Sequence, residues 1–293
     1  MRLLEITVAD TASQVVLEAH ANQRAALARE FDYYDLDLAG RSQLDCARAV
    51  DSVKTPDVVL LRGISSFYPI GRAFPQARLI VDHCTPTDLG QNPKGQHVLM
   101  RASVMCYSEA ARDKLRAAGA RKISVIPGPW LRDLRERRPR GRAIRVGFVP
   151  TPWARAALLD TMREGRELGW GHFEYYSVDK IIGATRVIDA VEMASVCDVL
   201  VHAQESEDLG APHDGAILSA AYGCGLVTVG LSALEASGLK KDVHFALAPK
   251  YTRGGYAKGL QTYAENRDVL DRGIESLVPD ADAFIHTLRR LVE

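Results

Sequence analysis

The stretch "ASVCDVLVHAQESEDLGAPHDGAILSAAYGCGLVTVG", residues 194–230, has two apolar runs separated by a polar loop and a run of small residues. The apolar runs "CDVLVHA" and "LVTVGL" predict buried parallel strands, and the small residues between them predict a helix that begins near 213–216. Strand, loop, helix and strand in this order form the repeating unit of α/β proteins. The first turn of such a helix offers unpaired backbone N–H groups and the positive end of the helix dipole, which suit an anionic ligand.

The same alternation of short apolar runs and helical stretches extends over most of the chain. Further strands are predicted at "LLEITVA", "DYYDLDL", "DVVLLRG", "RLIVDHC", "VMCYSE", "ISVIPGP", "AIRVGFVP", "HFEYYSV" and "HFALAP". Helices are predicted at 12–30, at 109–119 with Gly119 as the cap, and near 280–292. This pattern predicts an α/β fold with parallel sheets covered by helices.

An arginine-rich segment, "LRDLRERRPRGR" at 131–142, interrupts this alternation. We interpret it as a linker between two Rossmann-like parallel-sheet domains, 1–130 and 143–293, that face each other over a cleft. Its six arginines are either a solvated hinge or a phosphate-binding strip.

The composition narrows the class of protein. Lys plus Arg and Asp plus Glu are equal at 37 each, so net charge does not indicate a nucleic-acid or membrane partner. The first ten residues are too charged for a signal peptide, and no apolar run is long enough to span a membrane, so we predict a cytoplasmic protein. The five cysteines are widely spaced; buried thiols are the expected state, with Cys84 or Cys224 as the catalytic alternative.

The usual nucleotide-binding signatures are missing from the sequence. No G-x-G-x-x-G follows the first strand, and no G-x-x-x-x-G-K-[ST] occurs anywhere. This disfavours a simple dehydrogenase, a sugar epimerase with a dinucleotide cradle, or a P-loop kinase.

Three segments resemble the glycosyltransferases of the GT-B fold. "VMCYSEAARDKLRAAGARKISVIPGPW" (104–130) is similar to the end of the N-terminal domain in that family, and "IRVGFV" (144–149) is similar to its first C-terminal strand. "AYGCGLVTV" (221–229) stands where the family has small residues, a glycine and a strand. The resemblance implies a nucleotide-sugar donor, a UDP- or GDP-sugar, and a reaction that requires no metal.

The resemblance also assigns the donor-binding residues. Retaining members carry two glutamates separated by seven residues; those positions fall here on Gly210 and Leu218, so retention of configuration is in doubt. The helix start at Asp214, Gly215 and Ala216 is expected to hold the diphosphate. Asp214 is either a ribose or sugar contact or a plain N-cap, and Glu207 is a further candidate contact. The expected cations are Arg155, Lys250 and Arg253. The last two belong to the glycine-rich loop 250–259, which either closes over the donor or merely turns the chain.

The acceptor side is predicted at the end of "LIVDHCTPTD" (79–88), because polar residues that follow a buried strand point into the ligand crevice. His83 and Asp82 are the candidates for the catalytic base, with a structural role as the alternative. We also expect Trp153 either to stack on a base or sugar ring or to pack at the hinge.

These residues predict a glycosyltransferase that moves a sugar to an unidentified hydroxyl. One alternative is a phage-type enzyme that acts on a hydroxymethylated DNA base. The other is a non-catalytic domain that keeps the fold and binds a nucleotide, because the glutamate pair is absent.

Overall fold

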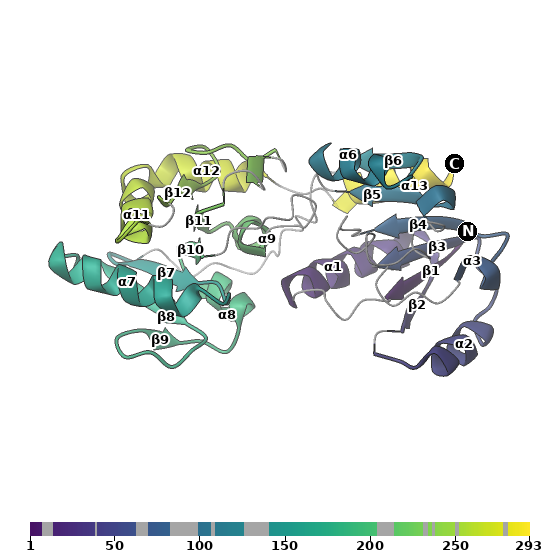
Figure 1. Ribbon diagram of the computed structural model, residues 1–293, viewed down its shortest axis with the longest axis horizontal. Helices are drawn as coiled ribbons and strands as arrows, with labels where there is room; N and C mark the ends of the chain where they lie inside the picture. Colours follow the sequence, from purple (N-terminus) through teal and green to yellow (C-terminus); the bar gives the residue numbers. More distant parts are fainter. Residues whose placement is uncertain are drawn as a thin grey trace. The chain divides into compact units, whose positions relative to one another are not determined.

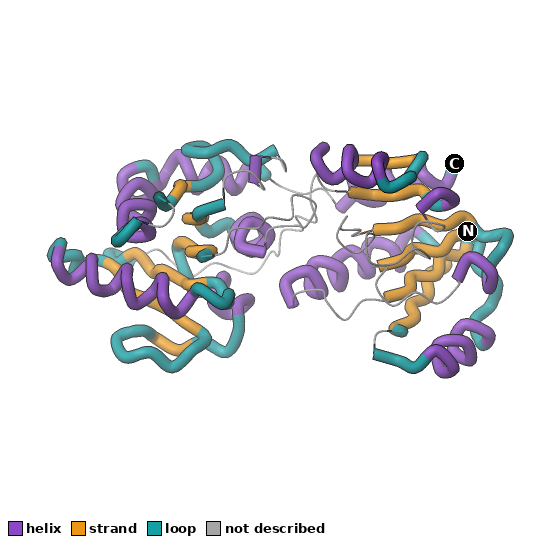
Figure 2. The backbone as a smooth tube through the Cα atoms, in the orientation of Figure 1, coloured by secondary structure: helices purple, strands orange, loops and turns teal. Residues whose placement is uncertain are grey.

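The structure is a computed structural model in which every predicted strand is present. It describes residues 1–7, 14–38, 40–62, 70–82, 99–106, 109–125, 141–203, 214–230, 234–235, 238–249, 252–277 and 281–293. The described chain forms two compact units, one from residues up to 125 together with 281–293, and one from 141–277. Figure 2 shows that helices and strands alternate in both.

The first unit is built on a six-stranded parallel sheet with the order β2-β1-β3-β4-β5-β6 (Figure 1). Its strands are β1 (Arg2–Thr7), β2 (Asp32–Asp37), β3 (Val58–Arg62), β4 (Arg78–Asp82), β5 (Ser103–Cys106) and β6 (Lys122–Val125). The chain leaves β1 toward one edge and then continues from β3 toward the other. The strand order therefore reverses between β1 and β3, which is where ligands bind in open α/β sheets.

Helices cover both faces of this sheet: α1 (Gln14–Glu30), α2 (Gln43–Asp51), α3 (Ile70–Ala73), α6 (Glu109–Ala117) and α13 (Ala281–Val292). Alternation along β1 sends Leu4 and Ile6 into a core shared with α2 and α6. Leu3 points to the opposite face, where α1 and α13 provide the core side chains. Gly119 has a φ of +102° after α6, as predicted for a helix cap.

The second unit has its own six-stranded parallel sheet, in the order β12-β11-β10-β7-β8-β9. Its strands are β7 (Ile144–Phe148), β8 (Phe173–Ser177), β9 (Thr185–Arg186), β10 (Val199–His202), β11 (Gly225–Thr228) and β12 (Ala246–Leu247). This is the Rossmann order, with its reversal between β7 and β10. The strand β9 was not predicted, because two exposed residues leave no periodic signal.

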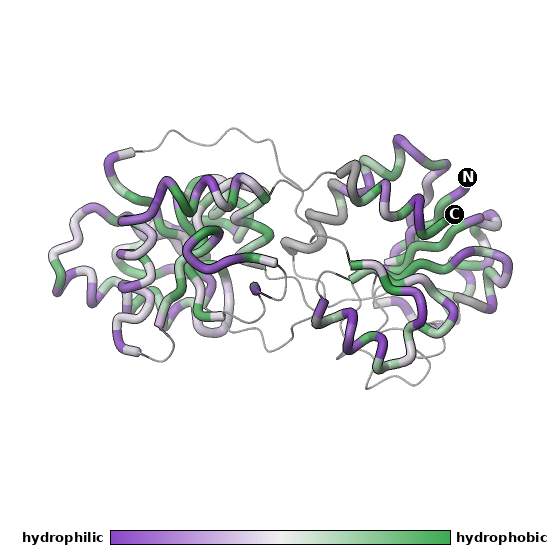
Figure 3. The backbone as a smooth tube through the Cα atoms, turned by 90° about the horizontal axis from the view of Figure 1, so that it is seen from above, coloured by the Kyte–Doolittle hydropathy of each residue, from purple (hydrophilic) through white to green (hydrophobic). Residues whose placement is uncertain are grey.

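The helices of the second unit are α7 (Ala154–Glu167), α8 (Ala190–Val196), α9 (Asp214–Tyr222), α11 (Gly255–Glu265) and α12 (Arg267–Ser276). The helices α7, α11 and α12 share one core with β7, β10 and β11. On the other face, α8 packs close to β7: a Cβ at Gly147 would clash with Met193. In Figure 3 the hydrophobic strands lie inside each unit.

The predicted extent of the second domain, 143–293, is wrong at its end. Phe284, Ile285 and Leu288 of α13 belong to the buried core of the first unit, where they pack with Leu27 of α1 and Leu60 of β3. An amphipathic helix must bury its apolar face, but its sequence does not specify which sheet it covers. Residues 126–140, which contain the predicted boundary at 130 and most of the linker 131–142, lie outside the described residues.

The cysteines that the structure describes are buried free thiols, as the sequence predicts. Cys46, Cys106, Cys197 and Cys224 are buried, and the described residues contain no disulfide. Burial, followed by the neighbouring Cys224, raises the pKa of the Cys197 thiol well above its usual value, which disfavours a reactive thiolate there.

None of the helices described here combines the length and the apolar character needed to span a membrane.

Candidate functional site

The carboxyl ends of β7 and β10 are the natural place for a ligand in the second unit. These strands are neighbours, with Val199 opposite Val146 in the register, and the Val149 amide donates to the Val201 carbonyl at 3.0 Å. The chain continues from β7 toward one edge of the sheet and from β10 toward the other. Two helices, α7 and α9, begin after these two strands, so their N-terminal N–H groups belong to the edge where ligands bind.

The start of α9 lies directly against the end of β10. A Cβ at Gly215 would be 2.8 Å from the Cβ of His202, so only glycine allows this approach. Ala216 is fully buried, and the Ser219 hydroxyl donates to the Gly225 carbonyl at 3.3 Å. Small side chains thus bring the first turn of α9 close to the carboxyl edge of the sheet, and the predicted helix start at Asp214 is confirmed.

A tight turn connects β7 to α7. The Ala154 amide donates to the Thr151 carbonyl at 3.1 Å, which places Pro152 and Trp153 at the centre of the turn. Trp153 has φ −100° and ψ −9°, close to the third position of a type I turn, and proline is favoured at the second position. Trp153 is also the N-cap of α7 but provides no side-chain cap.

The first turn of α7 is electropositive. It contains no acidic residue, and Arg155 within it is exposed. Arg155 makes no ion pair with any side chain that the structure describes. A guanidinium beside uncapped helix N–H groups is an arrangement that attracts anions.

Arg253 lies at the other end of α7 from Arg155. Its Nε donates to Oε1 of Glu164 at 2.7 Å, and an Nη donates to Oε1 of Glu167 at 3.0 Å. The Gly254 amide adds a bond to Oδ2 of Asp160 at 2.9 Å. Hydrogen bonding to Glu164 and the charges of both glutamates raise the pKa of Arg253.

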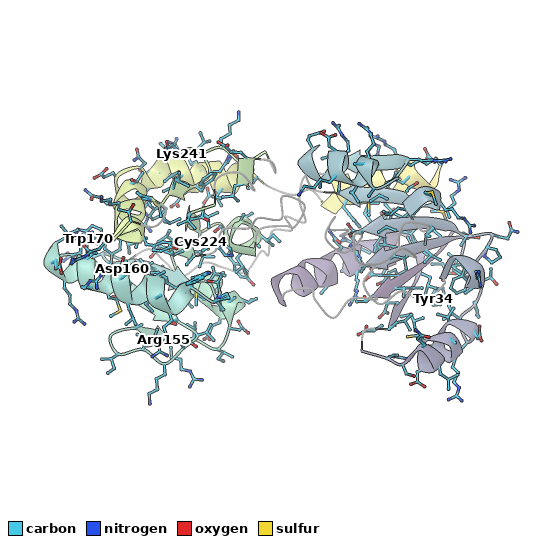
Figure 4. The ribbon with its side chains drawn as sticks, viewed as in Figure 1. Tyr34, Arg155, Asp160, Trp170, Cys224 and Lys241 are labelled. Atoms are coloured by element: carbon cyan, nitrogen blue, oxygen red, sulfur yellow. The ribbon has the colours of Figure 1, made fainter. Side chains whose placement is uncertain are left out.

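This position argues against Arg253 as a diphosphate contact. Glu164 is ten positions after Ala154, which corresponds to about 15 Å along the helix. Figure 4 likewise places Arg155 and Trp170, which follows α7, toward opposite ends of that helix. We therefore interpret Arg253 as a clamp that holds the segment before α11 against α7.

In the first unit, Asp82 is fully buried and ion-paired with Arg62, which is itself 2% exposed. Arg62 also donates to Oε2 of Glu5 at 3.4 Å, and Glu5 accepts from Nε of Arg24 at 2.7 Å. The ring of Phe284 lies 5.5 Å from the Arg62 guanidinium carbon. A buried carboxylate held by a guanidinium is poorly placed to accept a substrate proton, so the geometry favours a positioning role for Asp82.

Arg62 was not predicted from the sequence as a site residue. An arginine at the end of the apolar run "VVLLR" is a signal that could have found it, because a buried charge needs a partner. Four predicted site residues have side chains outside the described part of the structure: His83, Glu207, Asp214 and Lys250.

Comparisons with known proteins identify the fold. No protein-family model matches this chain, and no curated protein matches its sequence. Among solved structures, HepE from Anabaena in complex with UDP is 12% identical over 99% of both chains, with a TM-score of 0.64. HepE in complex with UDP-glucose has a TM-score of 0.59, at 11% identity over 100% of this chain and 98% of that chain.

Two further structures share the architecture. MnaA from S. aureus with UDP covers 99% of this chain and 96% of its own, at 10% identity and a TM-score of 0.65. The catalytic domain of starch synthase IV from Arabidopsis thaliana, bound to ADP and acarbose, matches 100% of this chain and 99% of its own, at 10% identity and a TM-score of 0.54. Identities this low establish the fold alone. The chain has the GT-B fold, with two Rossmann-like units that each contain a six-stranded parallel sheet.

Proposed function

We propose that this protein is a glycosyltransferase that takes a sugar from a UDP- or GDP-linked donor and transfers it to a hydroxyl group without a metal ion. One observation carries the proposal: the first turn of α9 lies against the end of β10 at the point where the strand order reverses. Solved proteins of the same fold hold UDP, UDP-glucose or ADP. A nucleoside diphosphate is the ligand class that this position suits.

In the proposed site, the backbone N–H groups of Asp214, Gly215 and Ala216 bind the diphosphate. Arg155 supplies a positive charge from the first turn of α7, and Lys250 is a further candidate. Asp214 or Glu207 contacts the ribose or the sugar. These groups would stabilise the charge that develops on the departing diphosphate, a role that metal ions fill in other enzymes.

His83 is the proposed base for the acceptor. The acceptor oxygen forms a bond to the anomeric carbon while the bond from that carbon to the diphosphate oxygen breaks. The proton of the acceptor passes to His83, and the nucleoside diphosphate leaves. Asp82 precedes His83 in the chain and, through Arg62, would anchor the end of β4.

A thermal-shift screen tests the donor assignment. The purified protein is heated with UDP, GDP, ADP, dTDP and their sugars, with and without EDTA. A ligand that binds only the native state adds about 2.7 kcal/mol of stability at a hundredfold excess over Kd. We expect one nucleotide to raise the melting temperature equally with and without EDTA. A shift that EDTA abolishes would contradict metal independence, and no shift at millimolar ligand would contradict the donor site.

Release of nucleoside diphosphate from the bound donor, measured by a coupled assay, separates an enzyme from a binding-only domain. If the protein binds the nucleotide sugar but releases no nucleoside diphosphate with every hydroxyl acceptor of a test panel, the assignment as an enzyme is contradicted. A DNA-base acceptor gains no support from the described residues, since its main sequence argument, the arginines of 131–142, falls mostly outside them.

A further inference from the structure

Trp153 is a large apolar side chain that the fold leaves exposed to solvent in the turn after β7, at the carboxyl edge of the second sheet. It is 63% exposed, whereas Trp170 packs against Phe173 with ring centroids 5.1 Å apart. Single exposed apolar residues are common, but tryptophan is the side chain with the most apolar surface to bury. Exposure of Trp153 therefore calls for a ligand more strongly than exposure of a leucine would.

The backbone under Trp153 is rigid. Pro152 precedes it with a fixed φ, the Thr151 carbonyl closes the turn at 3.1 Å, and the Ala157 amide donates to the Trp153 carbonyl at 3.0 Å as α7 begins. When a ligand binds, Trp153 therefore loses little conformational freedom beyond that of its two side-chain torsions. An aromatic side chain on such a turn loses little entropy when it binds.

The neighbours of Trp153 are polar groups suited to a hydroxylated ring. The Thr151 hydroxyl oxygen is buried and has no hydrogen-bond partner among the described residues. Arg155, two residues further along, is exposed. The turn follows β7, which pairs directly with β10, and neighbouring strands are about 4.8 Å apart. Trp153 thus lies in the turn that follows β7, the strand next to the one that leads to the start of α9.

We propose that Trp153 is the stacking platform for the pyranose ring of the donor's glycosyl group. The apolar C–H face of the sugar lies on the indole, and its hydroxyl edge faces the polar groups of the turn. This inference rests on the proposed function, because it needs a nucleotide sugar bound at α9.

The exposure of Trp153 favours the sugar over the nucleobase. A transferred sugar must stay open to the acceptor hydroxyl, so its contacts belong at an accessible rim. A nucleobase takes no part in the transfer and is held best where water is excluded. A side chain that is 63% exposed fits the first situation.

The experiment compares how tightly each variant binds a nucleotide sugar and the free nucleotide. Isothermal titration gives Kd for UDP and UDP-glucose, and for GDP and GDP-mannose, with wild type, Trp153→Ala and Trp153→Phe. We expect Trp153→Ala to weaken the nucleotide sugar about tenfold, equivalent to ~1.4 kcal/mol, and to leave the free nucleotide unchanged. Trp153→Phe keeps a ring and should retain most of the affinity. Leu168→Ala, which truncates an exposed apolar residue just after α7, is the matched control and should change neither Kd.

Each other outcome overturns the proposal in a distinguishable way. Unchanged binding of the sugar nucleotide by Trp153→Ala would show that the indole does not contact the donor. An equal loss for the nucleotide and the nucleotide sugar would place the indole on the base or the diphosphate instead. If wild type binds none of the four ligands, the proposed function fails first and this inference falls with it. Because Trp153 is exposed, the variants should melt within a few degrees of wild type, which excludes misfolding as the cause.

Discussion

Arg62 and Asp82 end neighbouring parallel strands at the same register position, and their side chains form an ion pair that is buried on both sides. Glu5 adds a second carboxylate to the same guanidinium, and Phe284 covers it. Two buried carboxylates therefore share this one guanidinium, and Arg24 adds a second ion pair to Glu5.

Arg62→Met should therefore be strongly destabilising, because both carboxylates stay buried while Asp82 loses its ion pair and Glu5 keeps only the one with Arg24. We expect the free energy of unfolding to fall by about 3–5 kcal/mol, measured by urea denaturation. The double variant Arg62→Met/Asp82→Asn should recover part of the loss. Arg2→Met, which breaks the exposed pair of Arg2 with Asp32, is the control and should cost no more than about 1 kcal/mol. A loss equally small for Arg62→Met would contradict the buried network.

Gly215→Val tests the close approach of α9 to β10. The new side chain would meet His202 at 2.8 Å and would move the first turn of the helix. We expect at least a tenfold weaker Kd for the nucleotide and a loss of roughly 1–3 kcal/mol in stability from overpacking. Gly171→Ala introduces a methyl group where nothing lies within 4 Å and should leave both quantities unchanged. Normal nucleotide affinity in Gly215→Val would rule out α9 as the diphosphate site.

Two arginines that the sequence proposes for the same role should behave differently. Arg155→Ala removes an exposed cation from the start of α7 and should weaken UDP binding about tenfold, since hydrogen bonds to charged groups contribute about 1.5–3 kcal/mol. Arg253→Ala removes a cation that Glu164 and Glu167 already engage, and it should leave Kd unchanged. Titration calorimetry of both variants decides the matter, and a larger effect from Arg253 would reverse the assignment.

Asp198 makes stability depend on pH. Burial alone would raise the pKa of this carboxyl, but hydrogen bonds and charge from Arg145, and the charge of Arg267, outweigh burial and lower it. A folded pKa below the unfolded value of about 3.9 stabilises the protein above that pH. This contribution is lost as pH falls through the folded pKa.

We expect Asp198→Asn to lose about 3–5 kcal/mol at pH 7, since Arg145 and Arg267 each lose their ion pair with Asp198, although Asp271 stays 3.7 Å from Arg267. Its stability should also change less than that of wild type between pH 4 and pH 2. Urea unfolding at both pH values measures this difference. Parallel pH profiles for the two proteins would show that Asp198 titrates normally in the folded state.

The strands were predictable because a parallel strand buried on both faces is a nearly continuous apolar run, as in "VVLL" of β3 and "VLV" of β10. The start of α9 was predictable because its small residues follow such a strand. The pairing of the charged residues was not predictable in this way. Asp82 was correctly placed at the end of a strand, but its contact with Arg62 follows from which strands are neighbours, and that depends on the strand order.

The same reason explains Arg253. In the sequence it belongs to a glycine-rich loop that either closes over a donor or merely turns the chain, whereas its partners Glu164 and Glu167 are in a helix almost ninety residues earlier. Gly255 is needed there because a Cβ would collide with the Pro249 carbonyl, a packing demand unrelated to any ligand. A motif of glycines and cations does not distinguish a loop that binds phosphate from one that fastens a helix.

The helix α13 imposes an order on biosynthesis. Its side chains complete the apolar layer over Leu3, Leu60 and Ile80, yet they are synthesised only after the whole second unit has been translated. A nascent chain that carries residues 1–125 therefore exposes this layer, and Arg62 lacks the Phe284 ring that covers it. The first unit to be synthesised is thus the last to close, and until α13 arrives its open sheet face is a surface that chaperones would recognise.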